Sequence, residues 1–265
     1  MRITASLTIP NIIATDHLDN TGASVAMSAT RKAALDTGIV ISNGTDADHD
    51  IDFAVGSEVL YNGSTYKYFT GTALTKQIDA NWVAGDAAGG FPSGLSLAAT
   101  TGYYLYMIGK TDGTVDYGFD TSLTAANLLS DATGYTYYKA IWWVITDASS
   151  NVVAFTQVNG DTCEYAAAIT DVQDTSGTSG TNETATISAP PNCTGIVYGA
   201  VNNHTSTSSM QLRLNNKIGS LALRFIGCML TPRLDGSSQL LYCAIFGTGS
   251  LNYITLETHG WRKKW

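Results

Sequence analysis

Four aspartates occupy alternate positions early in the chain. Of the residue groups in this sequence, they are the strongest candidates for metal ligands. They are Asp46, Asp48, Asp50 and Asp52, with His49 among them. On a strand these carboxylates would share one face, and in a loop they could offer oxygen ligands to Ca²⁺. A helix-loop-helix calcium loop needs Gly at its sixth position and Glu at its twelfth, where this chain has Ile51 and Ser57. We therefore interpret the run as a solvated loop that enters a strand, and we expect no metal site and no cofactor.

Motifs for nucleophilic catalysis are not found in the sequence. There is no G-x-S-x-G motif and no phosphate-binding G-x-x-x-x-G-K motif. The four cysteines, Cys163, Cys193, Cys228 and Cys243, form no C-x-x-C pair, so a zinc site is not expected. Whether Cys228 and Cys243 pair is left open. We expect no catalytic residues, and we predict that the protein is not an enzyme.

Aromatic residues are concentrated in two runs, "YYLYMIG" from 103 and "YTYYKAIWW" from 135. One face of each predicted strand must fill a core, because burial is the commonest fate of an aromatic ring in a sheet. The other face could line a subunit interface or a sugar-binding surface. The candidates for that outward role are Tyr104, Tyr106, Tyr138 and Trp143.

The stretch "LTKQIDANWVAGDAAGG", residues 74–90, places one Trp and a paired Lys and Asp among small residues. We interpret it as a structural corner where two sheets meet. Trp82 would anchor the core. Gly85, Gly89 and Gly90 would supply φ values that other residues avoid, as the chain crosses between sheets.

The net charge and the hydropathy of the chain argue against two classes of partner, nucleic acid and membrane. The formal net charge of −8 would repel a phosphate backbone, so nucleic acid is not an expected partner. The terminal "GWRKKW" is interpreted as a solvated or interface-facing tail. No stretch approaches the ~20 apolar residues that cross a bilayer, and the start lacks the apolar core of a signal peptide. We expect no membrane insertion and a product made and folded in a cytosol.

Turn signals predict the elements that position these residues. Asn62-Gly63 and Asp112-Gly113 each separate two strand-like runs and predict two hairpins. A third pair is predicted around "TDASSN", residues 146–151, and residues 22–36 could form a short helix. Short strands at this spacing predict an all-β fold of the β-sandwich or jelly-roll type.

A change of composition at residues 170–186, "TDVQDTSGTSGTNETAT", breaks the strand pattern. We expect three parts: an N-terminal attachment segment at 1–40, a β-sandwich at 41–168, and a smaller β-sandwich or jelly roll at 169–265.

Nineteen motif positions occur in a fixed order between about residues 50 and 160. They are Thr75, Lys76, Ile78, Asp79, Ala80, Trp82, Gly85, Gly89 and Gly90, then Tyr104, Tyr106, Ile108, Gly113, Val115 and Asp116, then Gly134, Tyr135, Thr136 and Phe155. This order resembles a module found in tail-fibre and other virion structural proteins of tailed bacteriophages. The second half more loosely resembles the small β-sandwich that often follows it, including Gly260-Trp261 near the end.

The resemblance implies a structural component of a phage virion, in the tail or a tail fibre, with contact to the host surface. It implies a homotrimer that meets other phage tail or capsid proteins and host cell-surface polysaccharide. The alternatives are a capsid decoration protein or head fibre, a glycan-binding receptor module, and a polysaccharide depolymerase.

Overall fold

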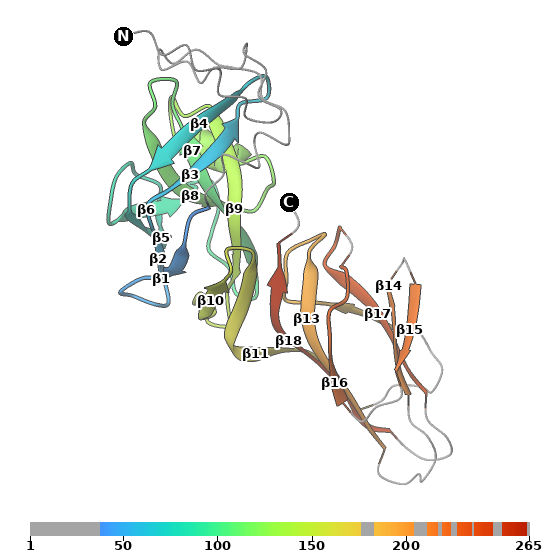
Figure 1. Cartoon of the computed structure of the whole chain (residues 1–265). Helices are drawn as coiled ribbons and strands as arrows, with labels where there is room; N and C mark the ends of the chain where they lie inside the picture. Colours follow the sequence, from blue (N-terminus) through green and yellow to red (C-terminus); the bar gives the residue numbers. More distant parts are fainter. Residues whose placement is uncertain are drawn as a thin grey trace, which may run out of the picture.

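The computed structural model describes residues 38–175, 183–203, 211–216, 219–223, 227–234, 236–245 and 251–263, and strands dominate it (Figure 1). The predicted all-β fold is confirmed, and the strands of the described residues form four sheets. The expected helix at 22–36 lies outside the described residues, as does nearly all of the expected attachment segment at 1–40.

Sheets I and II lie in the N-terminal half. Sheet I has the order β1-β2-β5-β6, with β1 Ile41–Asn43, β2 Asp50–Phe53, β5 Leu74–Asn81 and β6 Ala88–Phe91. Sheet II has the order β4-β3-β9-β7-β8, with β4 Tyr66–Gly71, β3 Gly56–Tyr61, β9 Tyr137–Ile145, β7 Gly102–Gly109 and β8 Val115–Asp120. The short helix α2, Ala126–Asp131, packs its Leu128 against Gly118 of β8.

Aromatic pairs join sheets I and II face to face. Phe53 of β2 stacks on Tyr117 of β8 with ring centroids 4.3 Å apart. Phe91 of β6 meets Tyr103 of β7 edge-on at 5.3 Å. Burial of such rings is the main source of hydrophobic stabilisation in a core of this kind.

Sheets III and IV lie in the C-terminal half. Sheet III has the order β10-β11-β18-β13-β16, with β10 Phe155–Val158, β11 Thr162–Asp174, β18 Leu251–Arg262, β13 Thr194–Asn203 and β16 Gly227–Leu230. Sheet IV has the order β12-β17-β14-β15, with β12 Glu183–Thr186, β17 Gln239–Ile245, β14 Gln211–Asn216 and β15 Gly219–Leu223. The strand nearest the C-terminus, β18, lies in the middle of its sheet.

Two of the three predicted hairpins are confirmed. β3 pairs with β4 across Gly63 (φ 90°), and β7 pairs with β8 across Gly113 (φ 99°). The strand pair predicted around "TDASSN" is wrong, because Thr146 and Val152 form only an isolated bridge and β10 pairs with β11. Asp147 instead folds the turn on itself, since its carboxylate accepts hydrogen bonds from the backbone N–H groups of Ser149 and Asn151.

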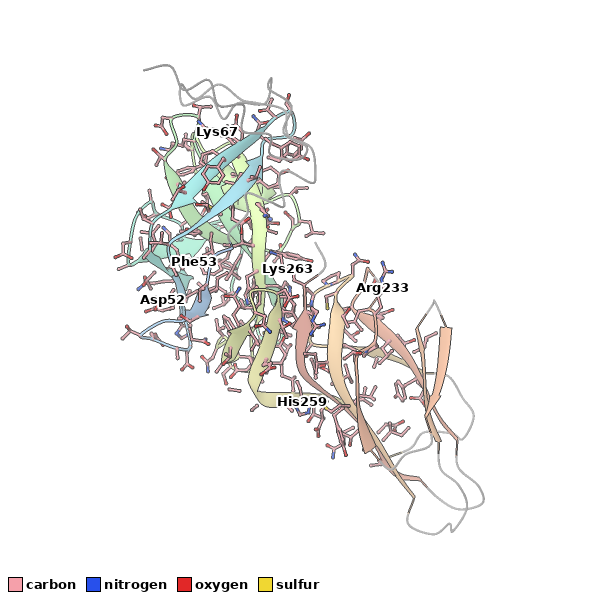
Figure 2. All side chains as sticks on the ribbon, in the orientation of Figure 1. Asp52, Phe53, Lys67, Arg233, His259 and Lys263 are labelled. Atoms are coloured by element: carbon pink, nitrogen blue, oxygen red, sulfur yellow. The ribbon has the colours of Figure 1, made fainter. Side chains whose placement is uncertain are left out.

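The two halves share one buried core. Trp142 of β9 and Trp261 of β18 lie 4.6 Å apart between ring centroids. The Lys263 ammonium, labelled in Figure 2, donates a hydrogen bond to the carbonyl oxygen of Ile141 at 2.9 Å. Ile141 is the extra residue of a bulge between β7 and β9. The expected boundary between residues 168 and 169 falls inside β11, and the division into domains stays a prediction.

Candidate functional site

The corner predicted from residues 74–90 contains an unusual strand connection. β5 and β6 pair in parallel, with Lys76 opposite Ala88 and Gln77 opposite Gly89, yet only residues 82–87 connect them. Parallel strands normally need a crossover of about a dozen residues or more. The loop 82–87 must therefore be held by contacts outside the sheet ladder.

Lys76 supplies those contacts from inside the protein. Its side chain is fully buried, and its Nζ lies 2.8 Å from Asp116 Oδ1. The same ammonium donates to the carbonyl oxygens of Val83 and Gly85, each at 2.8 Å. These three acceptors match the three N–H bonds of an ammonium group, so Lys76 fastens the loop to sheet II.

Asp116 of β8 completes the arrangement. Its Oδ2 accepts a hydrogen bond from the backbone N–H of Gly85 at 2.8 Å, and its Oδ1 accepts one from the backbone N–H of Tyr117 at 2.7 Å. A buried charge is tolerated when it is both paired and hydrogen-bonded. Both partners are committed to the loop, which makes this pair a fastening for the corner.

Trp82 closes the corner from the side. Its Nε1–H donates to the carbonyl oxygen of Tyr117 at 3.0 Å, on the strand at the edge of sheet II. Its half-buried ring lies 5.5 Å from Lys76 Nζ and meets Tyr135 edge-on at 5.5 Å. These contacts cover part of the β8 edge, which would otherwise present unpaired backbone groups.

The three glycines of the corner serve two different purposes. Gly85 has φ 106°, the left-handed region that was expected. Gly89 and Gly90 do not, so the reason expected for them is wrong. A Cβ at Gly89 would lie 2.0 Å from the carbonyl oxygen of Asn81, and one at Gly90 would lie 2.7 Å from the ring of Phe119. Both positions require glycine because other chain segments approach too closely.

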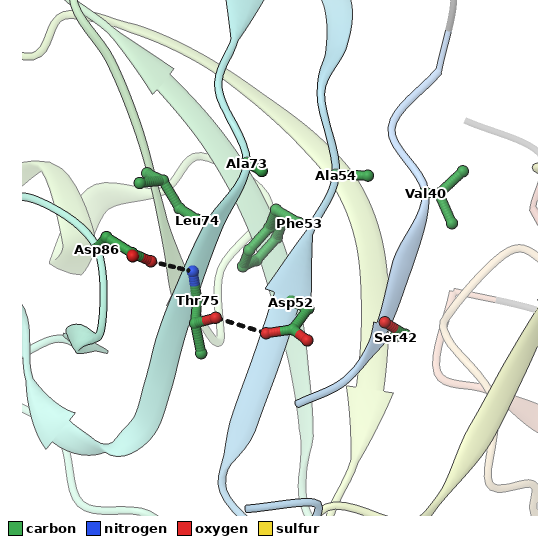
Figure 3. A pocket seen from close by; sticks show the side chains of 9 residues that line it. All are labelled: Val40, Ser42, Asp52, Phe53, Ala54, Ala73, Leu74, Thr75 and Asp86. Atoms are coloured by element: carbon green, nitrogen blue, oxygen red, sulfur yellow. Dashed lines mark hydrogen bonds between the residues drawn. The ribbon is translucent and has the colours of Figure 1, made fainter. Parts of the chain in front are cut away.

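The outer face of sheet I carries a hollow of about 340 Å³ beside the corner loop (Figure 3). It is lined by Val40, Ser42, Asp52, Phe53, Ala54, Ala73, Leu74, Thr75 and Asp86. We call it the sheet I hollow. The register places Ser42 opposite Asp52 and Asp52 opposite Thr75, so hydroxyl and carboxylate groups form one row across three strands.

Hydrogen bonds fix the acidic side of the sheet I hollow. Thr75 donates through Oγ1 to Asp52 Oδ1 at 2.5 Å and through its backbone N–H to Asp86 Oδ1 at 2.8 Å. Asp86 belongs to the loop that Lys76 and Asp116 hold from inside. The buried ion pair therefore positions one wall of the hollow.

The aspartates of the run 46–52 do not form one cluster in the structure. The backbone N–H of Asp48 and a ring nitrogen of His49 each hydrogen-bond to the Asp46 carboxylate, and both contacts are exposed. Asp50 and Asp52 lie on β2, and Asp52 reaches the sheet I hollow. Within the described ranges, no group of three or more His, Cys, Asp or Glu residues could hold a metal ion.

Most of the aromatic candidates lie inside the chain. Tyr104, Tyr106 and Trp143 are buried, and Tyr138 is half-buried. Burial raises the pKa of the Tyr106 phenol, whose O–H donates to the carbonyl oxygen of Ser122. Of these four candidates, Tyr138 is the one with enough exposed surface to contact another molecule.

The thiol of Cys163 is poorly suited to nucleophilic chemistry. Burial raises its pKa well above the ordinary value, with the neighbouring Glu164 and Cys193 adding to the rise. Because of this raised pKa, the thiol stays protonated near neutral pH. The thiolate is the reactive form, so the protonated thiol is a poor nucleophile. The question of a Cys228–Cys243 pair falls on side chains outside the described part of the chain.

A second cavity, of about 560 Å³, lies where β11 passes the N-terminal sheets. Its walls include Ile145, Val152, Val153, Ile169 and Ile187, with Asp48 and Asp147 among the lining residues. Its wall residue Ser188 donates hydrogen bonds to Asp171 through both its backbone N–H and its hydroxyl. Burial raises the pKa of Asp171 above its ordinary value.

The sequence pattern did not single out the residues that define the site. Lys76 and Asp116 are motif positions to which the sequence assigns no individual role, and no sequence pattern points to Ser42 or Asp86. The alternation of β2 could have placed Asp52 on the outer face, but only the register of β1 and β5 brings Ser42 and Thr75 beside it.

Comparisons with known proteins add no assignment. Family models, curated proteins and solved structures were searched, and none matches this chain. Among the described residues, no helix has the length and apolar character needed to span a membrane.

Proposed function

We propose that this protein is a non-enzymatic structural component of a tailed bacteriophage particle, in the tail or a tail fibre. It assembles as a homotrimer, meets other tail or capsid proteins, and contacts the host surface. It is made in the host cytoplasm and functions in the virion.

One observation carries the proposal. Lys76, Trp82, Gly85 and Asp116 are four of the positions that carry the resemblance to phage virion proteins, and they meet in one arrangement around the buried Lys76–Asp116 pair. They hold a loop, and they are fully occupied in doing so. On this proposal, the feature that the resemblance reflects is a way of building a sheet corner, which supports a structural role.

Three of the acidic side chains support the same proposal. Retaining and inverting glycosidases both need two carboxyl groups placed across a substrate groove. Asp116 is bound to Lys76 and Asp171 to Ser188 and Thr258, while Asp147 is held in a turn. These groups contribute to folding in ways that leave them poorly placed for bond cleavage.

The test is to locate the chain in intact particles. Proteomics of purified virions should detect it, and gold-labelled antibody should mark the tail or its fibres. Labelling of the head would favour a decoration protein or head fibre. Absence from particles, or release of reducing sugar from host envelope by the purified protein, would contradict the proposal.

The proposed homotrimer is tested separately, by the mass of the purified protein in solution. Light scattering of the purified chain after size-exclusion chromatography should give three times the 28.0 kDa protomer mass. A monomer that stays monomeric at high concentration would contradict the trimer and leave the location in the particle to be decided by the labelling.

A further inference from the structure

The sheet I hollow has two halves of opposite character. At one end, Val40, Ala54 and Ala73 present aliphatic surface, and at the other lie Ser42, Asp52, Thr75 and Asp86 (Figure 3). Ser42, Asp52 and Thr75 form one row of the sheet face, and the aliphatic residues lie two positions away along the chain from each of them, so the two groups of side chains point the same way. Asp86 joins the polar row from the neighbouring loop. A ligand that spans both groups must be apolar on one side and rich in hydrogen-bonding groups on the other.

A pyranose ring has this character. Its C–H groups form apolar faces, and its hydroxyl groups lie around the edge. Adjacent sugar hydroxyls can donate to carboxylate oxygens in charge-assisted bonds, and Ser42 can donate to or accept from a third hydroxyl. The volume of about 340 Å³ lies within the range of small-molecule sites.

We propose that the sheet I hollow binds a neutral hexopyranose unit, with hydroxyls on Asp52 and Asp86 and the ring against Val40. The hydrogen bonds within the described chain use one oxygen of each carboxylate. The second oxygen of each accepts from the sugar. The Lys76–Asp116 pair fixes the loop that carries Asp86, so the site is formed before the ligand arrives.

A metal ion and an organic cation are the rival ligands. Calcium takes six to eight oxygen ligands, whereas two acidic residues line this hollow. A cation needs acceptors only, so the donor capacity of the Ser42 and Thr75 hydroxyls would not be used. The mixed donors and acceptors beside aliphatic surface favour the neutral sugar.

The sugar source rests on the proposed function. In a virion protein that contacts the host, the hexopyranose belongs to a cell-surface polysaccharide. Binding of free hexoses by the purified chain does not depend on that assignment, so the two proposals can fail separately.

The experiment uses the purified full-length chain with free glucose, galactose, mannose and N-acetylglucosamine. Ligand-observed NMR and calorimetry measure binding. Val40→Glu puts a charged side chain where the apolar face of the ring would pack, and Val55→Glu is the matched control. Both valines are strongly exposed, at 64% and 67%, and Val55 does not line the hollow. Neither change should disturb folding, which circular dichroism verifies.

We expect saturable binding of at least one hexose that weakens by about tenfold or more in Val40→Glu and is unchanged in Val55→Glu. Affinity should change by less than about twofold between ~0.05 and ~0.5 M NaCl, because a neutral ligand is hardly screened. No hexose binding, equal loss in both variants, or binding of putrescine or Ca²⁺ alone would overturn the proposal. Detection of the chain in virions is scored independently and decides the proposed function.

Discussion

At the scale of single residues, the buried pair of Lys76 and Asp116 shows how charge is used in this protein. Desolvation of two charges is costly, and their attraction repays it only when all remaining donors and acceptors are satisfied. Here the ammonium has three acceptors and the carboxylate two backbone donors besides the lysine. The result is a fixed loop conformation. Removal of one partner should therefore lower the free energy of unfolding considerably.

Lys76→Met removes the ammonium and keeps a side chain of similar length. Asp116 would then be a buried carboxylate without its cation, and the free energy of unfolding should fall by about 3–5 kcal/mol. Urea unfolding measures the loss. Lys67→Met is the control, since the Lys67 ammonium makes an exposed hydrogen bond to the carbonyl of Thr111, and its loss should cost less than about 1 kcal/mol. Equal stability of Lys76→Met and wild type would refute the fastening role.

Asp171 gives a prediction about pH. Its carboxylate accepts hydrogen bonds from Ser188 and Thr258, but burial outweighs them and raises its pKa above the ordinary 3.8. The folded state therefore holds the proton more tightly than the unfolded state. This residue contributes most to stability at acidic pH, and its contribution declines as the pH rises from 3.8 through the raised pKa.

Asp171→Asn removes that titration and keeps an amide oxygen and N–H groups for the same partners. The stability of wild type minus that of Asp171→Asn should decrease between about pH 3 and pH 7, because only the wild-type residue acquires a buried charge. Chemical denaturation of both proteins across this range gives the difference and cancels the other titrating groups. A difference that stays constant with pH would show that burial does not control this carboxyl.

At the scale of elements, the parallel pairing of β5 and β6 depends on close backbone contact. The strands approach where Gly89 faces the Ala80 and Asn81 carbonyls, and the loop 82–87 turns at Gly85 with its positive φ. Backbone hydrogen bonds from Trp82 to Phe91 and from Val83 to Gly89 then close the corner. Space at Gly89 is therefore a condition for the corner to form.

Gly89→Ala should destabilise the protein by about 1–3 kcal/mol, because the added methyl cannot occupy space held by backbone atoms. Gly94→Ala is a matched control, since a Cβ there meets nothing within 4 Å and Gly94 lies outside the positive-φ set. It should be neutral or slightly stabilising. Thermal melting of both variants provides the comparison, and equal melting temperatures would contradict the steric explanation.

The two predicted hairpins that form are cases in which the local sequence is enough to predict the structure. Asn62-Gly63 and Asp112-Gly113 place a glycine where positive φ is needed, and both turns form as predicted. The turn at 146–151 contains no glycine, and it closes on the Asp147 carboxylate without forming a ladder. The chain beyond it, β10, instead pairs with β11 across Asn159-Gly160, whose positive φ values of 51° and 75° make it another local turn signal of the Asn-Gly type.

At the scale of the whole molecule, β18 connects the two halves. It pairs with β11 on one side and β13 on the other, and its Trp261 is fully buried against Trp142 and Trp143 of sheet II. The terminal "GWRKKW" was expected to be a solvated or interface-facing tail, and its Trp261 lies instead in the shared core. Stability of β9 is thereby linked to the end of the chain.

Trp261→Ala should lower the free energy of unfolding by about 3–5 kcal/mol, because it leaves a large cavity. Hydrogen exchange should increase in residues 141–145 of β9 as well as in β13, since both lose a packing partner. Arg262→Ala, an exposed neighbour that donates to Thr162 Oγ1, should have little effect. Unchanged exchange in β9 would mean that the two halves are energetically independent.

The sequence by itself determined the all-β class, the two glycine hairpins and the importance of residues 74–90, because these follow from side-chain alternation and local φ preferences. Only the tertiary structure decided that Lys76 and Asp116 pair, that Gly89 and Gly90 are required by contact, and that Ser42, Asp52 and Thr75 form one row. It also placed Trp261 in the core and most of the candidate aromatics inside the chain. These features depend on strand order and register between segments far apart in the sequence, which local patterns do not encode.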